Sequence, residues 1–347
     1  MTETRESPVS NGFGPPMGST ALVTGATGFT GSLLVRKLCQ RGVKVRAIAR
    51  ESSNTSELDD LNIEWFRGNV FDEAVVAEAA RGADYIFHLA AAFREARYGD
   101  DYYHKVHVAS TQLLAEAAVR NETFKRFVHV STVGVHGHIT DPPADETYRF
   151  APGDVYQNTK AEAELWIREF ARQRRLSVSV VRPAAILGPG DQRLLKIFRM
   201  AAWKAFPMLG FGRCLYHLIH VEDLTDAILL ASTHPAADGE VFICGNVEPI
   251  ATEDMARTIA SCYGRRLRVV RIPVWPFFFA AAVTTAIFKP LGMEPPIHRR
   301  RVAFYTKDRA FNTTKIRELL GWTPRFSNEA GLAETARWYL DRGWVQL

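Results

Sequence analysis

Short apolar runs alternate with stretches of helical pattern along the first half of the chain. The runs lie at residues 21–23, 43–48, 63–66, 85–89, 127–130 and 178–181. Stretches rich in Ala, Leu, Glu and Arg separate most of them, at residues 33–40, 74–80, 108–120 and 156–170. Continuous apolar strands are typical of a sheet covered on both faces. The pattern therefore predicts an α/β fold with a doubly wound parallel sheet.

This rhythm ends after about Arg182, where Pro- and Gly-punctuated loops such as Gly188-Pro-Gly190 take over. We expect a disordered tail at 1–18, a first domain at 19–183, and a smaller C-terminal α/β lobe at 184–347 that mainly binds substrate. An apolar run at 241–244 predicts a strand near 241–246 that returns to the first sheet.

Composition narrows the class of protein. The 347 residues are 47% hydrophobic, enough for a sizeable core, and 43 Lys and Arg against 38 Asp and Glu leave a net charge of +5. This charge is too dilute to predict a nucleic-acid surface and suits small acidic or phosphorylated ligands. The four cysteines lie far apart without metal-ligand spacing, which predicts free thiols, no metal site and a reducing, cytoplasmic location.

An apolar segment at 274–288 (VWPFFFAAAVTTAIF) stands out, with arginines before and after it. It is shorter than the roughly 20 residues that span a bilayer. A buried helix lining an apolar cavity is the favoured interpretation. Contact with a membrane surface is the alternative, which we do not expect. Both point to an apolar substrate.

A glycine-rich segment, Thr24-Gly-Ala-Thr-Gly-Phe-Thr-Gly31, joins the first strand to the first helix. At this junction Gly25, Gly28 and Gly31 allow a tight turn and a close approach of the backbone to a pyrophosphate at the helix N-terminus. The segment predicts dinucleotide binding by a Rossmann-type domain over 19–183.

The end of the second strand selects the dinucleotide. An acid there binds the ribose 2′-hydroxyl, whereas an arginine receives a 2′-phosphate. Arg50 stands at this end, followed by Ser52 and Ser53, so NADP(H) is favoured. NAD(H) is the alternative, because Glu51 could reach a ribose hydroxyl instead.

Tyr156 and Lys160 are four residues apart at the start of a predicted helix and therefore share one face. An ammonium beside a phenol lowers the pKa of the phenol, which makes Tyr156 a candidate general acid/base. A hydroxyl at Ser131 or Thr132, after the fifth predicted strand, could bind the reacting oxygen.

Together these motifs resemble the extended short-chain dehydrogenase/reductase family, and the resemblance covers almost the whole chain after the tail. The further motifs are His88-Leu-Ala-Ala91, Val181-Arg-Pro183 with Gly188-Pro-Gly-Asp191, His220-Val-Glu-Asp-Leu224, Leu320-Gly-Trp-Thr-Pro324 and Trp338-Tyr339.

The resemblance implies a role for each matching residue. It makes Tyr156 the acid/base, Lys160 the residue that lowers the pKa of Tyr156, and Thr132 the hydroxyl that positions the substrate oxygen. It also implies a homodimer formed through the helices around 108–120 and 156–170. The implied cofactor contacts are Gly25, Thr27, Gly28, Phe29, Thr30, Gly31, Arg50, Asn69, Val70, Leu89, Ala90, Ala91, Tyr156, Lys160 and Pro183.

The chain departs from the family pattern at two positions. Asn69 replaces the aspartate that usually accepts the adenine amine, and its amide oxygen could still do so. His107 replaces an asparagine that, in the family, helps to hold the catalytic lysine through water. The histidine either takes over this role or weakens the proton relay.

The family resemblance implies an NAD(P)-dependent oxidoreductase. We favour reversible hydride transfer at a secondary alcohol or ketone of a largely apolar cyclic substrate, steroid- or flavonoid-like. One reason is Tyr216, which stands where sugar-nucleotide enzymes carry an arginine, although Arg213 and Arg193 are near.

A nucleotide-sugar epimerase with tightly held NAD is the alternative. Dehydration is the less favoured branch of that alternative, because Val133 and Gly134, not acids, follow Thr132. A non-catalytic dinucleotide-binding sensor is the third hypothesis, and His107 is its main support.

Overall fold

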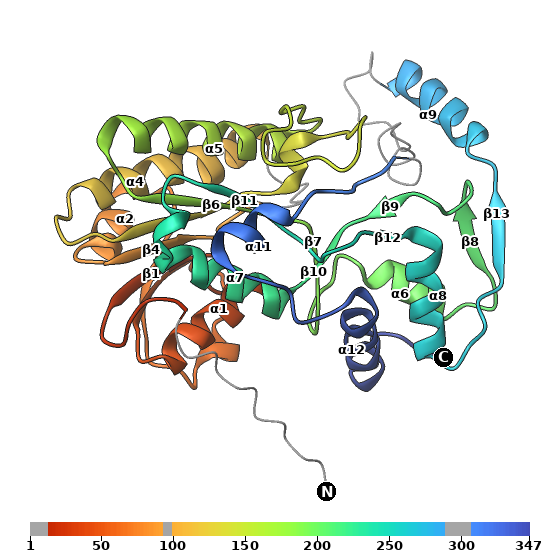
Figure 1. The fold of residues 1–347 in the computed structure, drawn as a ribbon, viewed down its shortest axis with the longest axis horizontal. Coiled ribbons are helices and arrows are strands. Elements are labelled where there is room, and N and C mark those ends of the chain that lie inside the picture. Colours follow the sequence, from red (N-terminus) through yellow and green to blue (C-terminus); the bar gives the residue numbers. More distant parts are fainter. Residues whose placement is uncertain (1–12, 93–98, 289–306) are drawn as a thin grey trace, which may run out of the picture. The chain divides into compact units, whose positions relative to one another are not determined.

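The computed structural model describes residues 13–92, 99–288 and 307–347 and divides into two compact units (Figure 1). The first unit comprises the chain up to Ser131, Asn158–Val181 and Thr225–Val241. The second comprises Thr132–Gln157, Arg182–Leu224 and Phe242–Leu347. Residues 132–157, assigned above to the first domain, thus belong to the second unit.

A seven-stranded sheet in the order β11-β6-β5-β4-β1-β2-β3 forms the framework of the first unit. The pairs from β3 across to β6 are parallel, so the predicted doubly wound Rossmann-type sheet is confirmed. Strand β11 lies at the edge beside β6, so the run at 241–244 returns to this sheet as predicted. The strands are β1 (Thr20–Thr24), β2 (Lys44–Ala49), β3 (Ile63–Arg67), β4 (Tyr85–His88), β5 (Arg126–Val130), β6 (Val178–Pro183) and β11 (Val241–Cys244).

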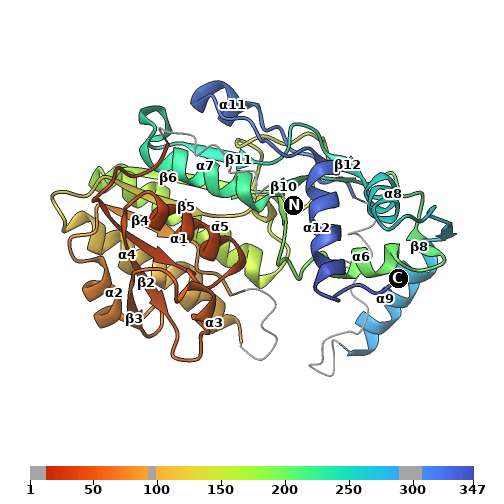
Figure 2. The ribbon, with the colours of Figure 1, turned by 90° about the horizontal axis from the view of Figure 1, so that it is seen from below.

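Helices cover both faces of this sheet (Figure 1). Buried side chains of α2, α4 and α5 pack on one face around Phe127 and Leu22. Helices α1 and α7 lie on the other face, where Lys37 forms an ion pair with Asp226 at 2.7 Å. Figure 2 shows α2 and α3 near the edge formed by β2 and β3. The helices are α1 (Phe29–Gln40), α2 (Glu73–Ala80), α3 (Asp100–His104), α4 (Ser110–Val119), α5 (Val155–Arg174) and α7 (Val221–Thr233).

A π-helical turn, Lys105–Ala109, connects α3 to α4 without a break. The helix predicted at 108–120 therefore belongs to a longer helical segment that begins at Asp100. The described residues also contain three short 3₁₀ helices, at Ser56–Leu58, Val133–His136 and Pro235–Ala237.

The second unit contains paired short strands around its own core. Strand β7 (Ala185–Leu187) pairs with β10 (Leu218–His220), and β8 (Phe206–Leu209) pairs with β13 (Val269–Ile272), both in parallel. Strand β9 (Leu215–Tyr216) pairs with β12 (Ile250–Ala251) in antiparallel fashion. The core is built mainly from α6 (Leu195–Ala201), α8 (Thr252–Cys262) and α12 (Asn328–Asp341). Helix α11 (Thr314–Leu320) precedes α12 in the chain.

The apolar segment at 274–288 forms helix α9, Trp275–Phe288. Its side chains are less buried than predicted: Trp275 is 72% exposed, Phe279 69% and Val283 40%. The prediction of a buried helix is therefore wrong for these three residues. Among the described residues, no helix has the length and apolar character needed to cross a membrane.

Part of the predicted tail is folded. Residues 1–12 lie outside the described residues. Beyond them, the Gly14 amide donates to Thr233 Oγ1 at 3.1 Å and the Gly18 amide donates to the Gly42 carbonyl at 2.9 Å. Pro15 is buried. The ordered chain thus begins before residue 19.

Candidate active site

The glycine-rich turn brings helix α1 against the end of β1. Gly25 has a φ of +74°, and a Cβ there would lie 2.9 Å from the Ala90 amide nitrogen. A Cβ on Gly31 would lie 2.0 Å from the Gly25 carbonyl oxygen, inside any allowed contact distance. The turn therefore closes only because these positions lack side chains.

The N-terminus of α1 has the properties of an anion site. Helix α2 is capped by Asp72, whose carboxylate accepts from the Ala74 amide at 3.1 Å. Helix α1 begins after Gly28, with no side-chain cap and no acid in its first turn. The amides of a helix N-terminus bind phosphate well when no carboxylate competes, so these residues fit a dinucleotide pyrophosphate.

Thr24 ties this turn to the loop that follows β4. Its hydroxyl accepts from the Ala90 amide at 3.2 Å and therefore donates to His88 Nδ1 at 2.7 Å. The Leu89 amide donates to the Thr24 carbonyl at 3.2 Å. Two segments predicted to hold the cofactor are thus joined directly.

Arg50 follows the last residue of β2 and is exposed. Its guanidinium lies 3.4 Å from the Tyr102 hydroxyl. Arg67, at the end of the neighbouring strand β3, donates to the carbonyls of Arg50 and Ser53. Sequence reasoning missed Arg67, although its place at the end of the third strand could have signalled a second cation.

The other predicted cofactor residues of the first unit lie at the carboxyl ends of its strands. Asn69 follows β3, and the loop after β4 contains Ala90 and Ala91, buried and exposed respectively. Thr27, Phe29, Thr30, Val70 and Leu89 belong to these same turns. Pro183 is the last residue of β6, is buried, and belongs to the second unit.

Lys160 lies on α5 and is 2% exposed. Its ammonium donates to the Val130 carbonyl at 2.6 Å. Burial lowers the pKa of Lys160 to about 8, and the nearby carboxylate of Glu164 opposes the shift. Lys160 therefore loses its proton more readily than an exposed lysine does.

Tyr156 and Thr132 meet in the second unit. Tyr156 lies in the first turn of α5, where the Asp154 carboxylate accepts from the Gln157 amide at 2.7 Å. A side-chain hydrogen bond joins Tyr156 to Thr132. Burial raises the pKa of Tyr156 to about 12, and Arg193 is the positive charge that opposes it. The expectation that Lys160 lowers this pKa is not met, because desolvation dominates.

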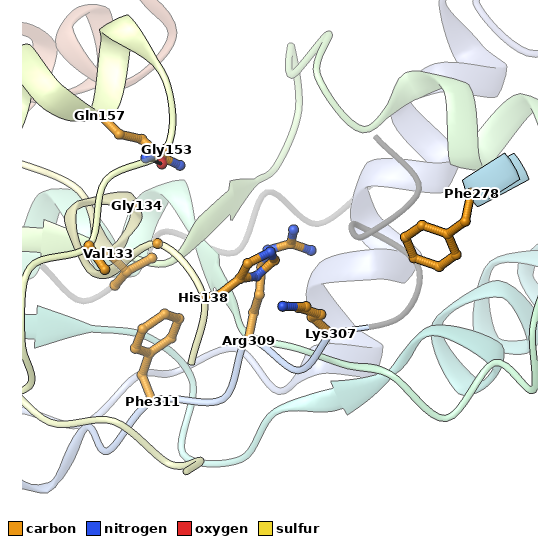
Figure 3. A pocket seen from close by; sticks show the side chains of 11 residues that line it. Val133, Gly134, His138, Gly153, Gln157, Phe278, Lys307, Arg309 and Phe311 are labelled. Carbon is orange, nitrogen blue, oxygen red and sulfur yellow. Dashed lines mark hydrogen bonds between the residues drawn. The ribbon is translucent and has the colours of Figure 1, made fainter. Parts of the chain in front are cut away.

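A cavity of about 450 Å³ lies in the second unit, next to these residues in sequence. Val133 and Gly134 follow Thr132, Gln157 follows Tyr156, and all three line the cavity (Figure 3). Phe278 from α9 and Phe311 supply apolar surface. The cavity therefore has apolar surface on part of its wall and is lined by residues next in sequence to Thr132 and Tyr156.

The same cavity carries cations that sequence reasoning missed. These are Lys307 and Arg309, whose side chains lie beside each other in Figure 3; the imidazole of His138 lines the cavity as well. The Arg309 guanidinium lies 5.8 Å from the centre of the Tyr216 ring. Tyr216 stands where sugar-nucleotide enzymes of the family carry an arginine. Here Arg309, 93 residues further along the chain, places its guanidinium over the Tyr216 ring.

His88, His107 and His129 lie together in the core of the first unit and are fully buried. Burial, followed by the charge of Lys160, lowers the pKa of His88 to about 3 and that of His107 to about 2. The pKa of His129 is also lowered well below its usual value, and neither of its ring nitrogens has a hydrogen-bond partner among the described residues. All three rings are neutral at physiological pH.

Comparison with known proteins agrees with this geometry. Residues 21–245 match the model of the NAD dependent epimerase/dehydratase family. Sterol demethylase protein B of Methylococcus capsulatus is 39% identical over 334 residues, which cover 94% of this chain and all of that protein. A 3 beta-hydroxysteroid dehydrogenase/Delta 5-->4-isomerase of Mycobacterium tuberculosis is 28% identical, covering 92% and 90% of the two chains.

Among solved structures, the crystal structure of gox2253 superposes with a TM-score of 0.81. It is 26% identical and the match covers 94% of this chain and all of that one. The match of the family model over most of the chain, with the glycine turn and the Tyr156 site in place, establishes the relationship. The chain belongs to the NAD dependent epimerase/dehydratase family, whose members include NAD(P)-dependent oxidoreductases, epimerases and dehydratases.

Proposed function

We propose that this protein is an NAD(P)-dependent dehydrogenase acting on a secondary alcohol or ketone of a largely apolar, sterol-like cyclic molecule. The observation that carries the proposal is the cavity that contains Phe278 and Phe311 and is bordered by the residues after Thr132 and Tyr156. The names of two relatives, a sterol demethylase protein B and a 3 beta-hydroxysteroid dehydrogenase, support the same substrate class.

In this mechanism the side chains of the protein manage the proton. The phenol of Tyr156 is protonated at neutral pH, so it can donate to a carbonyl oxygen as that oxygen gains negative charge. The hydroxyl of Thr132 positions the same oxygen. A dinucleotide held by the glycine turn would supply the hydride for reduction or accept it in oxidation. In the reverse direction the phenol of Tyr156 first loses its own proton to solvent, and the resulting phenolate then accepts the alcohol proton.

We also propose that NADP(H) is the preferred dinucleotide. Arg50 is exposed at the end of β2, and Arg67 lies against its backbone. Two guanidinium groups at this position suit a ribose 2′-phosphate better than a hydroxyl.

Nucleotide-sugar epimerisation remains the second candidate because of one observation, the cations of the cavity. Lys307 and Arg309 could bind a diphosphate, which sugar nucleotides carry. In that case the cofactor is recycled, and no net reduction of the dinucleotide accompanies turnover.

A paired substitution on α9 tests the apolar assignment. Phe278 lines the cavity, whereas its neighbour Phe279 is 69% exposed. With a 3β-hydroxysteroid as substrate, Phe278→Ala should raise KM on the order of 10- to 100-fold, because the substrate loses its apolar contact with one aromatic ring. Phe279→Ala is the matched control and should leave KM unchanged.

The assay follows formation of reduced nicotinamide with a 3β-hydroxysteroid and, separately, the epimer ratio of UDP-glucose. Lys307→Ala should leave steroid oxidation nearly intact. The contrary result is epimerisation of UDP-glucose that Lys307→Ala abolishes and Phe278→Ala does not change. That result would refute the dehydrogenase proposal in favour of the epimerase.

A further inference from the structure

His107 lies in the π-helical turn and contacts two segments of the first unit. Its Nε2 accepts from the Ala92 amide at 3.0 Å, and its Nδ1 lies 2.7 Å from Thr159 Oγ1. The ring is fully buried and packs edge-on against Tyr103, with 6.0 Å between the ring centres.

These contacts fix the tautomer. A backbone amide can only donate, so Nε2 is the unprotonated nitrogen that receives the Ala92 N–H. In a neutral ring the proton then resides on Nδ1 and is donated to Thr159 Oγ1. The imidazole is thus used fully at both nitrogens.

The two partners of His107 belong to different parts of the site. Ala92 follows the loop Leu89–Ala91, whose residues the resemblance makes cofactor contacts. Thr159 immediately precedes Lys160, whose ammonium is held by the Val130 carbonyl. His107 therefore connects the cofactor loop to the turn of α5 that carries the lysine.

A parallel connection runs through His88. The Ala90 amide donates to Thr24, Thr24 donates to His88 Nδ1, and His88 Nε2 donates to Ser110 Oγ at 3.2 Å. Ser110 Oγ in turn donates to the Val106 carbonyl, in the same π-helical turn as His107. Two amides of one loop are thus anchored on one helical turn, Ala90 through His88 and Ala92 through His107.

We propose that His107 is a positioning residue that holds the cofactor loop through Nε2 and the Lys160 turn of α5 through Nδ1, and that it transfers no proton itself. The proposal rests on the assignment of Lys160 to catalysis and of residues 89–92 to the cofactor. It differs from the family arrangement, in which an asparagine holds the lysine through water.

Three substitutions separate the two bonds. Asn places its amide nitrogen near the position of Nδ1, so His107→Asn keeps the bond to Thr159 and loses the bond to Ala92. Gln places its amide oxygen near the position of Nε2, so His107→Gln keeps the bond to Ala92 and loses the bond to Thr159. His107→Phe loses both. Thermal unfolding of each variant shows whether it is folded.

The Asn and Gln variants of His107 should have different effects. His107→Asn should raise the dinucleotide Kd about 10-fold while kcat changes little, because a buried amide loses its acceptor. His107→Gln should keep the Kd and lower kcat about 10-fold. His104→Gln is the control, since His104, at the end of α3, is 48% exposed and contacts the exposed side of α5, at Glu162, with 3.1 Å between Nε2 and Oε1. His104→Gln should change neither the dinucleotide Kd nor kcat.

Several outcomes would overturn the proposal. Equal effects of the Asn and Gln variants on Kd and kcat would show that His107 has only a structural role. Loss of a limb near pH 6.5 from the pH profile of kcat in His107→Gln would make the imidazole a proton carrier.

The proposed cofactor site is tested separately by Gly31→Ala. If Gly31→Ala leaves the dinucleotide Kd unchanged, the assignment of the glycine turn to the cofactor fails. If Gly31→Ala abolishes dinucleotide binding and His107→Asn does not weaken it, the cofactor site is supported and only the positioning role of His107 is refuted.

Discussion

The buried histidines should make the first unit sensitive to mild acid. His88, His107 and His129 are neutral in the folded protein because burial lowers their pKa values to about 3, about 2 and well below the usual value. In the unfolded chain a histidine has a pKa near 6.5. Below that pH the unfolded state binds protons that the folded state does not, so stability falls as pH falls.

The size of the effect follows from the linkage between pH and stability. Each histidine with a depressed folded pKa loses about 1.4 kcal/mol of stability per pH unit below pH 6.5. Between pH 7 and pH 5 this amounts to about 2 kcal/mol for each ring and about 6 kcal/mol for the three. The loss continues until the pH reaches the folded pKa values, near 3 and below.

His129→Phe isolates one of the three contributions. The ring of His129 has no hydrogen-bond partner among the described residues and stacks against Phe127, with 6.5 Å between the centres. Phenylalanine has a similar shape and removes two unsatisfied nitrogens. The variant should gain about 1–3 kcal/mol at pH 7 and lose about 2 kcal/mol less than the native chain between pH 7 and pH 5.

Equilibrium urea unfolding at pH 7, 6 and 5, followed by circular dichroism at constant ionic strength, measures these free energies. His104→Gln serves as the control, because that side chain is 48% exposed. Parallel stability curves for His129→Phe and the native chain would refute the claim that His129 is neutral in the fold.

Three further predictions concern the site itself. Gly31→Ala should abolish dinucleotide binding, measured by fluorescence titration, because the new Cβ collides with the Gly25 carbonyl; Gly99→Ala, where a Cβ meets nothing within 4 Å, should bind normally. Tyr156→Phe should lower kcat by roughly 10²- to 10⁴-fold with an unchanged dinucleotide Kd, and an active variant would remove Tyr156 from the mechanism. Arg50→Ala should weaken NADPH binding at least tenfold more than NADH binding, since it removes a charged contact to the 2′-phosphate; equal losses would leave the preference unexplained.

The sequence was informative where one local pattern determines the structure. The strands from β1 to β6 were predicted to within about two residues at each end, because parallel strands buried on both faces are continuous apolar runs. The glycine turn was equally clear, since the close approach of Gly31 to Gly25 excludes every side chain.

Features that depend on distant contacts could not be predicted. The strands of the second unit are two to four residues long and exist through their pairing, so no pattern identifies them. Lys307 and Arg309 reach the cavity from a segment about 150 residues after Gln157, and nothing near them signals a binding site. The pKa of Tyr156 was predicted in the wrong direction, because desolvation depends on burial, which spacing on a helix does not reveal.

The π-helical turn Lys105–Ala109 also sets the rotational phase of the helical segment that contains it. An α-helix advances about 100° per residue, and a turn closed over five residues contains one residue more than an α-helical turn. Tyr102, before the turn, contacts Arg50, while Ser110, after it, contacts His88. An uninterrupted α-helix would misalign these two contacts by about 100°. Deleting one residue from this turn would thus rotate one end of the segment away from its partner without shortening the chain noticeably.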